Sequence, residues 1–394
     1  MQLLKLDEDF LSKKAAILTA QEIAGQAELW KNIATSFYKA SDDIEKFLNA
    51  AYTAADNIIL TGAGTSAFIG LSLEGTFFRN TQIITRAIAT TDIVSHPQDY
   101  FNTNQTTLII SFARSGNSPE SCAALELADK LSEKCFHLIV TCDAGGALGQ
   151  YHSSNPIYVF VLPEAANDKG LAMTGSYSGM LLSGLMIAYI EKQQKIKQQV
   201  ELLIRASENI FFNSLSTLQK VSGIDFKRAV FLGSGNLFGT ATEAALKLQE
   251  LTDGQVICKT DTYLGLRHGP KAVIDESTLV VYFFSNNNYA KRYEKDLVNA
   301  MKNSNNAIFQ LGISERFETI NNLDAQVNFG IDMENIEEDF LPVCAILPGQ
   351  LLAFYKSLQL GLMPDTPSVN GSISRVVQGV NIYPIEKELR VSYD

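Results

Sequence analysis

Two segments rich in glycine and hydroxyl side chains follow apolar stretches in the first half of the chain. GAGTSA begins at Gly62 directly after NIILT, and SFARSGNSPES begins at Ser111 directly after TLII. Hydroxyls and backbone N–H groups at the carboxyl ends of strands can surround the oxygens of a phosphate, and Arg114 would add positive charge. The candidate phosphate ligands are Gly64, Thr65, Ser66, Arg114, Ser115, Gly116, Asn117 and Ser118.

Two other interpretations of these segments are open. Serines after a strand often only cap the next helix, and this is the simpler explanation for one loop alone. GAGTSA also fits the dinucleotide-binding pattern G-x-G-x-x-A, but the next predicted strand, TQIITRA, ends without the acidic residue that would bind a ribose. Arg86 could instead contact a 2′-phosphate. Because two hydroxyl-rich loops occur in one half of the chain, we favour a phosphate site.

Residues suited to acid–base chemistry lie in the second half, in EAALKLQE and RHGPK. Glu243, Lys247 and Glu250 are spaced i, i+4 and i+7, which places them on one face of a predicted helix. This pattern alone favours a solvated face of ion pairs. His268 stands in a turn bounded by glycine and proline rather than in an apolar stripe. A histidine in such a turn can transfer protons near neutral pH.

The elements that must position these residues form a repeat. From Ile58 onward, short β-branched runs alternate with helix-like segments, which predicts βαβ units on parallel sheets. Gly62 and Gly64 recur after 171 residues as Gly233 and Gly235 (233−62 and 235−64), and TLIISF recurs as TLVVYF at the same spacing. The second copy has fewer hydroxyls in its loops, so we expect the phosphate site in the first. The predicted units are a helical N-terminal arm over 1–44, doubly wound α/β domains over 45–200 and 201–375, and a tail over 376–394.

Composition excludes several classes of partner. A net charge of −11 argues against a nucleic-acid or anionic-membrane partner, because such binding needs a basic face. The five cysteines show neither zinc-ligand spacing nor an even disulfide framework, so we expect no metal site and a reducing cytoplasmic location. The longest apolar stretch, GMLLSGLMIAYI, is shorter than the roughly 18 residues of a membrane span. Because the apolar stretches are this short, we expect a soluble protein. No cofactor motif is favoured, so we expect no cofactor.

The motifs together resemble those of a known family. ILTGAGTSAFIG, SFARSGNSPES, KGLAMT, LGSGNLFGTATEAALKLQELT, GLRHGPK and DTPSVNGSISRVVQGV extend over essentially the whole chain. They resemble the sugar isomerase (SIS) superfamily, and more closely its AgaS family, which is linked to tagatose 6-phosphate and galactosamine 6-phosphate metabolism. The resemblance implies two tandem flavodoxin-like SIS domains with parallel sheets, and a 6-phosphosugar as substrate.

The isomerase half of glucosamine-6-phosphate synthase is the nearest mechanistic template in this superfamily. Its phosphate-binding hydroxyls correspond to the 64–66 and 115–118 segments, although Ala113 and Arg114 replace a serine and a glutamine. Its catalytic helix and histidine turn correspond to Lys247, Glu250 and His268. The resemblance therefore implies that His268 opens the sugar ring, and that Glu250 moves a proton between carbons 2 and 1 with Lys247 as its electrostatic partner.

The tail and the amino terminus differ from this template. A lysine of its tail has only an approximate counterpart here, Arg375, which we treat as a candidate lid residue. A glutamine-hydrolysing domain is not expected, because residue 2 is Gln2 rather than a nucleophilic cysteine. His268 follows Glu250 by 18 residues (268−250), in the second domain, whereas the phosphate loops belong to the first. One chain must therefore fold its halves face to face or borrow the histidine, and we expect a homodimer, or a dimer of dimers, with shared active sites.

The sequence thus leads to one preferred function and two alternatives. We expect a galactosamine-6-phosphate deaminase/isomerase that forms tagatose 6-phosphate and ammonia by ring opening and enolamine proton transfer. Tagatose-6-phosphate aldose/ketose isomerisation without deamination would use the same residues. A sugar-phosphate-sensing regulator is a different class, but no basic helix-turn-helix segment is apparent, and the presence of both Glu250 and His268 favours an enzyme.

Overall fold

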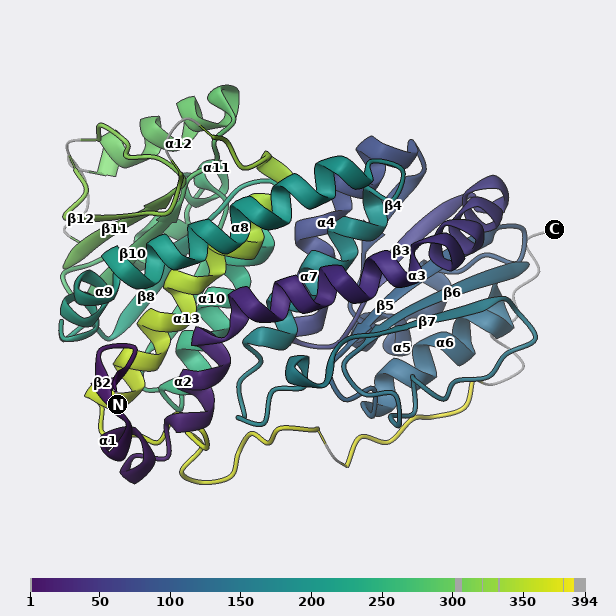
Figure 1. Ribbon diagram of the computed structural model, residues 1–394, viewed down its shortest axis with the longest axis horizontal. Coiled ribbons are helices and arrows are strands. Elements are labelled where there is room, and N and C mark those ends of the chain that lie inside the picture. Colours follow the sequence, from purple (N-terminus) through teal and green to yellow (C-terminus); the bar gives the residue numbers. More distant parts are fainter. Residues whose placement is uncertain (1, 302–306, 321, 332–333, 378, 386–394) are drawn as a thin grey trace.

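The N-terminal region is mostly helical. The computed structural model describes residues 2–301, 307–320, 322–331, 334–377 and 379–385. A short hairpin, β1 (Gln2–Leu3) and β2 (Leu6–Asp7), precedes the helices α1 (Glu8–Lys13), α2 (Ile17–Ala24) and α3 (Gln26–Ala54). The long helix α3 has the apolar periodicity of an amphipathic helix and buries Trp30, Ile33 and Phe37. Figure 1 shows it crossing the molecule toward the first sheet.

The first sheet is parallel and has the order β4-β3-β5-β6-β7. Its strands are apolar on both faces, because helices cover both. Ile59, Ile109 and Ile139 belong to the core under α5 and α6, whereas Leu60 and Ile110 belong to the core under α3, α4 and α7. The bounds are β3 (Asn57–Thr61), α4 (Thr65–Thr81), β4 (Ile84–Ala87), α5 (Thr90–Ser95), β5 (Thr106–Ala113), α6 (Pro119–Leu131), β6 (Lys134–Thr141), β7 (Ile157–Val161) and α7 (Gly175–Ala188).

The second sheet repeats the first. Its order, β9-β8-β10-β11-β12, has the same topology, and β8 follows β3 by 171 residues at both ends (228−57 and 232−61). Both orders are the flavodoxin-like 2-1-3-4-5, so the predicted fold is confirmed. The bounds are α8 (Gln193–Asn213), α9 (Leu215–Ser222), β8 (Arg228–Leu232), α10 (Leu237–Leu251), β9 (Ile257–Asp261), α11 (Tyr263–Leu266), β10 (Thr278–Phe283), α12 (Asn288–Met301), β11 (Phe309–Ser314), β12 (Ala325–Asn328) and α13 (Leu341–Gln359).

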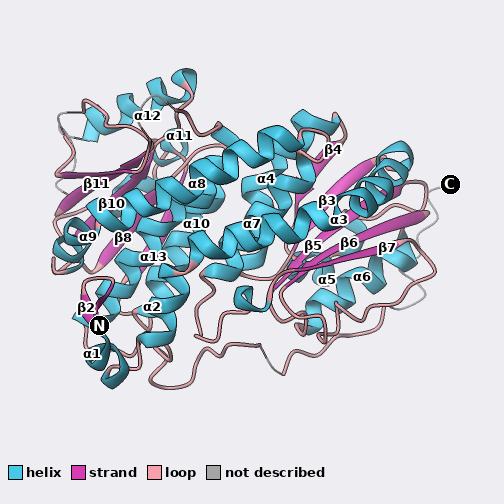
Figure 2. Cartoon of the chain, viewed as in Figure 1, coloured by secondary structure: helices cyan, strands magenta, loops and turns pink. Residues whose placement is uncertain are grey.

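Helices fill the space between the two sheets (Figure 2). A single apolar cluster joins residues of α3, α4, α7, α10 and α13, so the core is continuous between the halves. The helices α3 and α8 run without a break through positions 44 and 200, and the domain boundaries therefore stay predictions. Among the described residues, Glu338–Gln359 is the one helix long and apolar enough to cross a membrane, and 94% of its apolar window is buried inside the protein.

Candidate active site

The loop after β3 brings a helix N-terminus close to the strand. Gly64 has a φ of +55°, a conformation that favours glycine, and a Cβ at Gly62 would lie 2.6 Å from the Ser66 Cβ. The tight turn starts α4 at Thr65, so Thr65 and Ser66 form its first turn. Both side chains are almost fully buried from bulk solvent and line a cleft of about 500 Å³. Two of the predicted phosphate-binding hydroxyls thus lie at a helix N-terminus, where anions are favoured.

The loop after β5 supplies a second wall of the same cleft. Ser115, Gly116 and Ser118 line it, and Gly116 has a φ of +66°. The Ser118 hydroxyl donates a hydrogen bond of 2.7 Å to the Glu120 carboxylate. Asn117 is exposed and is not among the described residues that line the cleft. Its side-chain oxygen accepts the Ala147 N–H at 3.0 Å, so the structure places Asn117 where it braces the loop from outside.

The helix α10 contributes Lys247 and Glu250 from the second half of the chain. Close packing of α10 on α4 requires Gly239, because a Cβ there would lie 2.5 Å from the Phe68 carbonyl oxygen. This approach lets the Lys247 ammonium donate a hydrogen bond of 3.1 Å to the Thr65 hydroxyl. Lys247 also pairs with the Glu250 carboxylate, and both residues line the cleft. The phosphate loops and the predicted catalytic helix therefore share one site within a single chain.

The charged face of α10 is buried rather than solvated. The side chains of Glu243 and Lys247 are 0% and 1% exposed, and that of Glu250 is 23% exposed toward the cleft. Glu243 lies behind Lys247, with 3.4 Å between its Oε1 and the Lys247 Nζ. The i, i+4, i+7 spacing alone predicts a solvated face of ion pairs. That prediction is wrong, because the two halves of the chain pack together over this face.

Burial and neighbouring charges shift the pKa values of Glu243 and Lys247 in opposite directions. Burial raises the pKa of Glu243 to about 8, although the Lys247 charge lowers it. Burial alone would lower the pKa of Lys247, but the Glu243 and Glu250 carboxylates outweigh burial and raise that pKa above its ordinary value. Lys247 is therefore held as a cation beside Glu250, where it can stabilise negative charge that develops on a substrate.

Arg114 and Arg375 lie beside each other at the cleft, and their guanidinium groups bind protein oxygens. Arg114 is 6% exposed and donates to the Leu171 carbonyl at 3.1 Å and to the Arg375 carbonyl. Arg375 donates to the Asp168 carbonyl at 2.9 and 2.6 Å and to the Asn167 side-chain oxygen at 2.6 Å. Burial, together with the charge of Arg375, lowers the pKa of Arg114.

His268 lies outside this cleft in the single chain. It is exposed, on the turn after α11, where Gly269 has a φ of +119°. Within the part of the chain that the structure describes, the cleft lining does not include it. The structure thus gathers ten of the twelve predicted site residues around one cleft and leaves Asn117 and His268 outside it.

Comparison with known proteins places this site in a family. The SIS domain family matches residues 51–190. The D-galactosamine-6-phosphate deaminase AgaS of Shewanella sp. (strain ANA-3) is 39% identical over 389 residues, which are 98% of this chain and 96% of that relative. This chain belongs to the AgaS family.

Solved structures share the AgaS-family fold. The tagatose-6-phosphate ketose/aldose isomerase of Escherichia coli superposes with a TM-score of 0.83 at 34% identity, over 93% of this chain and 96% of that chain. A protein of Clostridium novyi NT superposes with a TM-score of 0.94 at 40% identity, over 98% of this chain and 100% of that chain. The resemblance identified from sequence motifs is thus confirmed.

Sequence reasoning assigned no role to four further residues of this AgaS-family cleft. Leu171 and Met173 belong to the KGLAMT motif, and Ser372 and Ser374 belong to NGSISR near the end of the chain. Both segments belong to the motifs that carry the family resemblance. Neither has helical or strand periodicity, so position in the motif was the only available signal.

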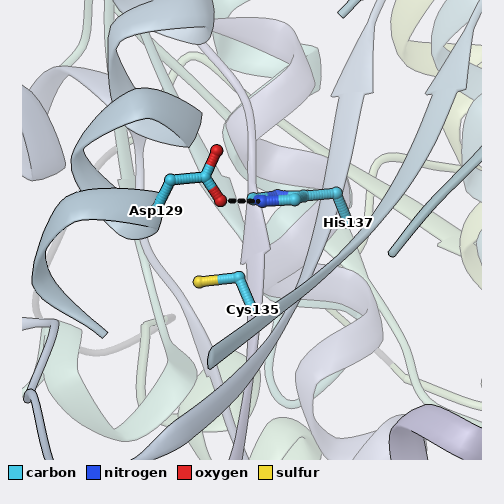
Figure 3. Close-up of side chains that lie close together, drawn as sticks. All are labelled: Asp129, Cys135 and His137. Atoms are coloured by element: carbon cyan, nitrogen blue, oxygen red, sulfur yellow. Dashed lines mark hydrogen bonds and ion pairs between the residues drawn. The ribbon is translucent and has the colours of Figure 1, made fainter. Parts of the chain in front are cut away.

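A separate cluster of side chains lies near the start of β6, at the amino ends of the strands, whereas the cleft lies at their carboxyl ends. Asp129, Cys135 and His137 are close enough together to be considered as metal ligands (Figure 3). The dashed contact in Figure 3 is a 2.7 Å hydrogen bond between the His137 Nε2 and Asp129. The same carboxylate accepts from Tyr151 at 2.7 Å and from Asn155 at 2.8 Å. Three hydrogen bonds therefore account for its position, and burial raises the pKa of the Cys135 thiol to about 12, which keeps it protonated.

Proposed function

We propose that this chain is a galactosamine-6-phosphate deaminase that forms tagatose 6-phosphate and ammonia. The observation that carries the proposal is the contact of Lys247, which pairs with Glu250, with the Thr65 hydroxyl. This contact brings the candidate acid–base residues and the two candidate anion-binding loops into one cleft. The names of the relatives support this substrate: AgaS proteins of Shewanella sp. (strain ANA-3) and Escherichia coli O157:H7, at 39% and 37% identity, are D-galactosamine-6-phosphate deaminases.

The phosphate group of the substrate would occupy the floor of the cleft. Ser66 and Ser115 can donate hydroxyl hydrogens, and the positive φ of Gly64 and Gly116 is typical of turns whose backbone N–H groups bind an anion. Thr65 and Ser118 complete the set of hydroxyls. Held in this way, a 6-phosphosugar extends from the phosphate loops toward α10, where Glu250 reaches the reacting carbons.

Glu250 is the proposed base. After ring opening, its carboxylate removes the proton from carbon 2 of the sugar and returns it to carbon 1. Negative charge develops on the substrate during this transfer, and the adjacent Lys247 ammonium stabilises it. The transfer turns the 2-amino aldehyde into a ketimine, and water then adds to carbon 2 and releases ammonia. Overall, galactosamine 6-phosphate and water give tagatose 6-phosphate and ammonia.

His268 is the proposed group for ring opening, supplied by a second copy of the chain. His268 lies on an exposed turn outside the cleft of its own chain, and a histidine that acts as acid or base must reach the substrate. A neighbouring chain could bring it there. We therefore propose a homodimer, or a dimer of dimers, in which each cleft receives the histidine of a neighbour. A cytoplasmic location accords with the five cysteines, each of which is described and is a free thiol.

Tagatose-6-phosphate isomerisation without deamination is the second candidate. The 34% identity to the Escherichia coli tagatose-6-phosphate ketose/aldose isomerase favours it specifically. Purified protein incubated with galactosamine 6-phosphate should release one ammonia for each ketose formed. Interconversion of tagatose 6-phosphate with its aldose, without ammonia from the aminosugar, would support the isomerase. Failure to convert either substrate would contradict both functions.

A further inference from the structure

The segment from Thr366 to Val377, which we call the strap, covers the cleft. It follows α13 and runs along the lower edge of Figure 1, in yellow, from the side of the second sheet toward the first. Ser372 and Ser374 line the cleft, and Ser374 also lines a second hollow of about 270 Å³ on another side of the strap. Residues 369–374 are exposed. With open space on two sides, the strap gains little from apolar packing, so its anchors must hold it in place.

Each end of the strap has a distinct anchor. Just before its start, the Asp365 N–H donates to the Ala15 carbonyl at 2.8 Å, and the Asp365 carboxylate accepts the Thr19 N–H at 2.8 Å. Near its other end, Arg375 binds the Asp168 carbonyl. The first anchor joins the strap to the N-terminal helices, and the second joins it to the loop between β7 and α7.

That loop is itself rigidly fixed. The Asp168 carboxylate accepts the N–H groups of Thr174, Gly175 and Ser176 at 2.8 to 3.1 Å, which satisfies the N-terminus of α7. Glu22 of α2 accepts the N–H groups of two neighbouring loop residues. Arg375 therefore attaches the strap to a firm support.

Arg114 joins this support to the phosphate loop. Its guanidinium donates to Leu171 of the support and to the Arg375 carbonyl of the strap. In sequence it immediately precedes Ser115, a proposed phosphate ligand. A single buried side chain thus links the proposed phosphate site to the segment that covers the sugar.

We propose that Arg114 is a positioning residue that fastens the strap over the cleft, so that Ser372 and Ser374 contact the sugar and select its hydroxyl pattern. This inference rests on the proposed function for the identity of the sugar. Arg114 acts here through the strap, and the hydroxyls and turns of the two loops carry phosphate affinity. Loss of its side chain leaves two carbonyl oxygens without their donor and loosens this end of the strap.

Hydrogen–deuterium exchange tests the fastening without any substrate. Arg114→Ala should raise exchange in peptides covering 366–377 by about tenfold or more while the strands of both sheets stay protected. Arg205→Ala is the matched control, since Arg205 is partly exposed on α8 and pairs with Glu334. Unchanged strap protection in Arg114→Ala would overturn the proposal.

Ligand measurements separate positioning from direct phosphate binding. Inorganic phosphate should bind Arg114→Ala within about threefold of the wild type, whereas kcat/KM for galactosamine 6-phosphate should fall by roughly tenfold or more. A large loss of phosphate affinity with normal strap protection would make Arg114 a phosphate ligand and overturn the proposal. If wild-type protein releases no ammonia, the proposed function fails, and the exchange comparison still decides the role of Arg114.

Arg375→Ala gives a second test that does not require the Arg114 variant to fold. It removes the strap's own anchor and should produce the same rise in strap exchange. The losses in the double variant Arg114→Ala/Arg375→Ala should be smaller than the sum of the two single losses, because both side chains belong to one hydrogen-bond network at the same end of the strap. Fully additive losses in strap protection would show two independent effects and contradict the proposal.

Discussion

The Lys247 ammonium donates a hydrogen bond of 3.1 Å to the Thr65 hydroxyl, and the two residues lie 182 positions apart. Thr65 opens the first helix after β3, and Lys247 lies on the helix after the equivalent strand of the second sheet. This contact places the two halves of the chain face to face around one cleft. The proposed catalytic residues of one half can therefore act on a phosphosugar bound at the proposed phosphate loops of the other half.

The hydroxyls of the phosphate loops should affect binding more than turnover. Ser66→Ala and Ser115→Ala should each raise KM by roughly ten- to a hundredfold, the value of one hydrogen bond to a charged group, with little change in kcat. Steady-state kinetics with galactosamine 6-phosphate measure both parameters. Ser12→Ala, on the exposed side of α1, is the control. Unchanged KM values in both cleft variants would contradict the assignment.

Removal of the buried ammonium should cost both activity and stability. In Lys247→Met, the Glu243 carboxyl loses its buried counter-charge. We expect turnover to be lost and the free energy of unfolding at pH 9 to fall by on the order of 3 kcal/mol. Adding Glu243→Gln should restore most of the stability but none of the turnover. Urea unfolding measures the free energy, and wild-type stability of Lys247→Met at pH 9 would contradict the electrostatic account.

Glu294 offers a pH-dependent test away from the cleft. Burial raises its pKa to about 8, with Glu338 and Glu318 adding to this effect and the Ser285 N–H and Lys291 opposing it. The pKa of Glu294 is higher in the folded than in the unfolded protein, so its protonation contributes to the free energy of unfolding. This contribution is fully present below about pH 4.5 and is lost as the pH rises through about 8.

The variant Glu294→Gln should therefore flatten this part of the stability profile. At pH 9 it should be more stable than the wild type by on the order of 1–3 kcal/mol, because the wild type must bury a charged carboxylate. Urea unfolding across the pH range measures the difference. Glu126→Gln, on the exposed face of α6, should leave the profile unchanged. Parallel profiles for Glu294→Gln and the wild type would contradict the account.

Mixing of inactive subunits tests whether sites are shared. Mixed dimers of Glu250→Gln and His268→Ala contain one site with both groups intact, so activity should return to about a quarter of the wild type. A mixture of Glu250→Gln with Lys247→Met is the control and should stay inactive, because those two residues come from the same chain. With subunit exchange confirmed by mass spectrometry, no recovery in the first mixture would show that each chain uses its own histidine.

Sequence alone predicted the parts of this structure that local pattern controls. The 171-residue repeat located β3 and β8, and the glycine-hydroxyl loops were found because their chemistry is local to each turn. The burial of Glu243 and Lys247 was missed, since a charged helix face has the same spacing whether water or another domain covers it. The carbonyl partners of Arg114 were equally invisible, because the strap lies 261 residues away and has no periodicity.

In the proposed reaction, Glu250 transfers the substrate proton between carbons 2 and 1. In deuterium oxide, wild-type protein should introduce solvent deuterium into the sugar during turnover of galactosamine 6-phosphate. Glu250→Gln keeps the shape of the side chain but removes its basicity. Deuterium incorporation, measured by mass spectrometry and NMR, should therefore fall by about a thousandfold while phosphate binding persists. Incorporation by Glu250→Gln at the wild-type rate would contradict the account.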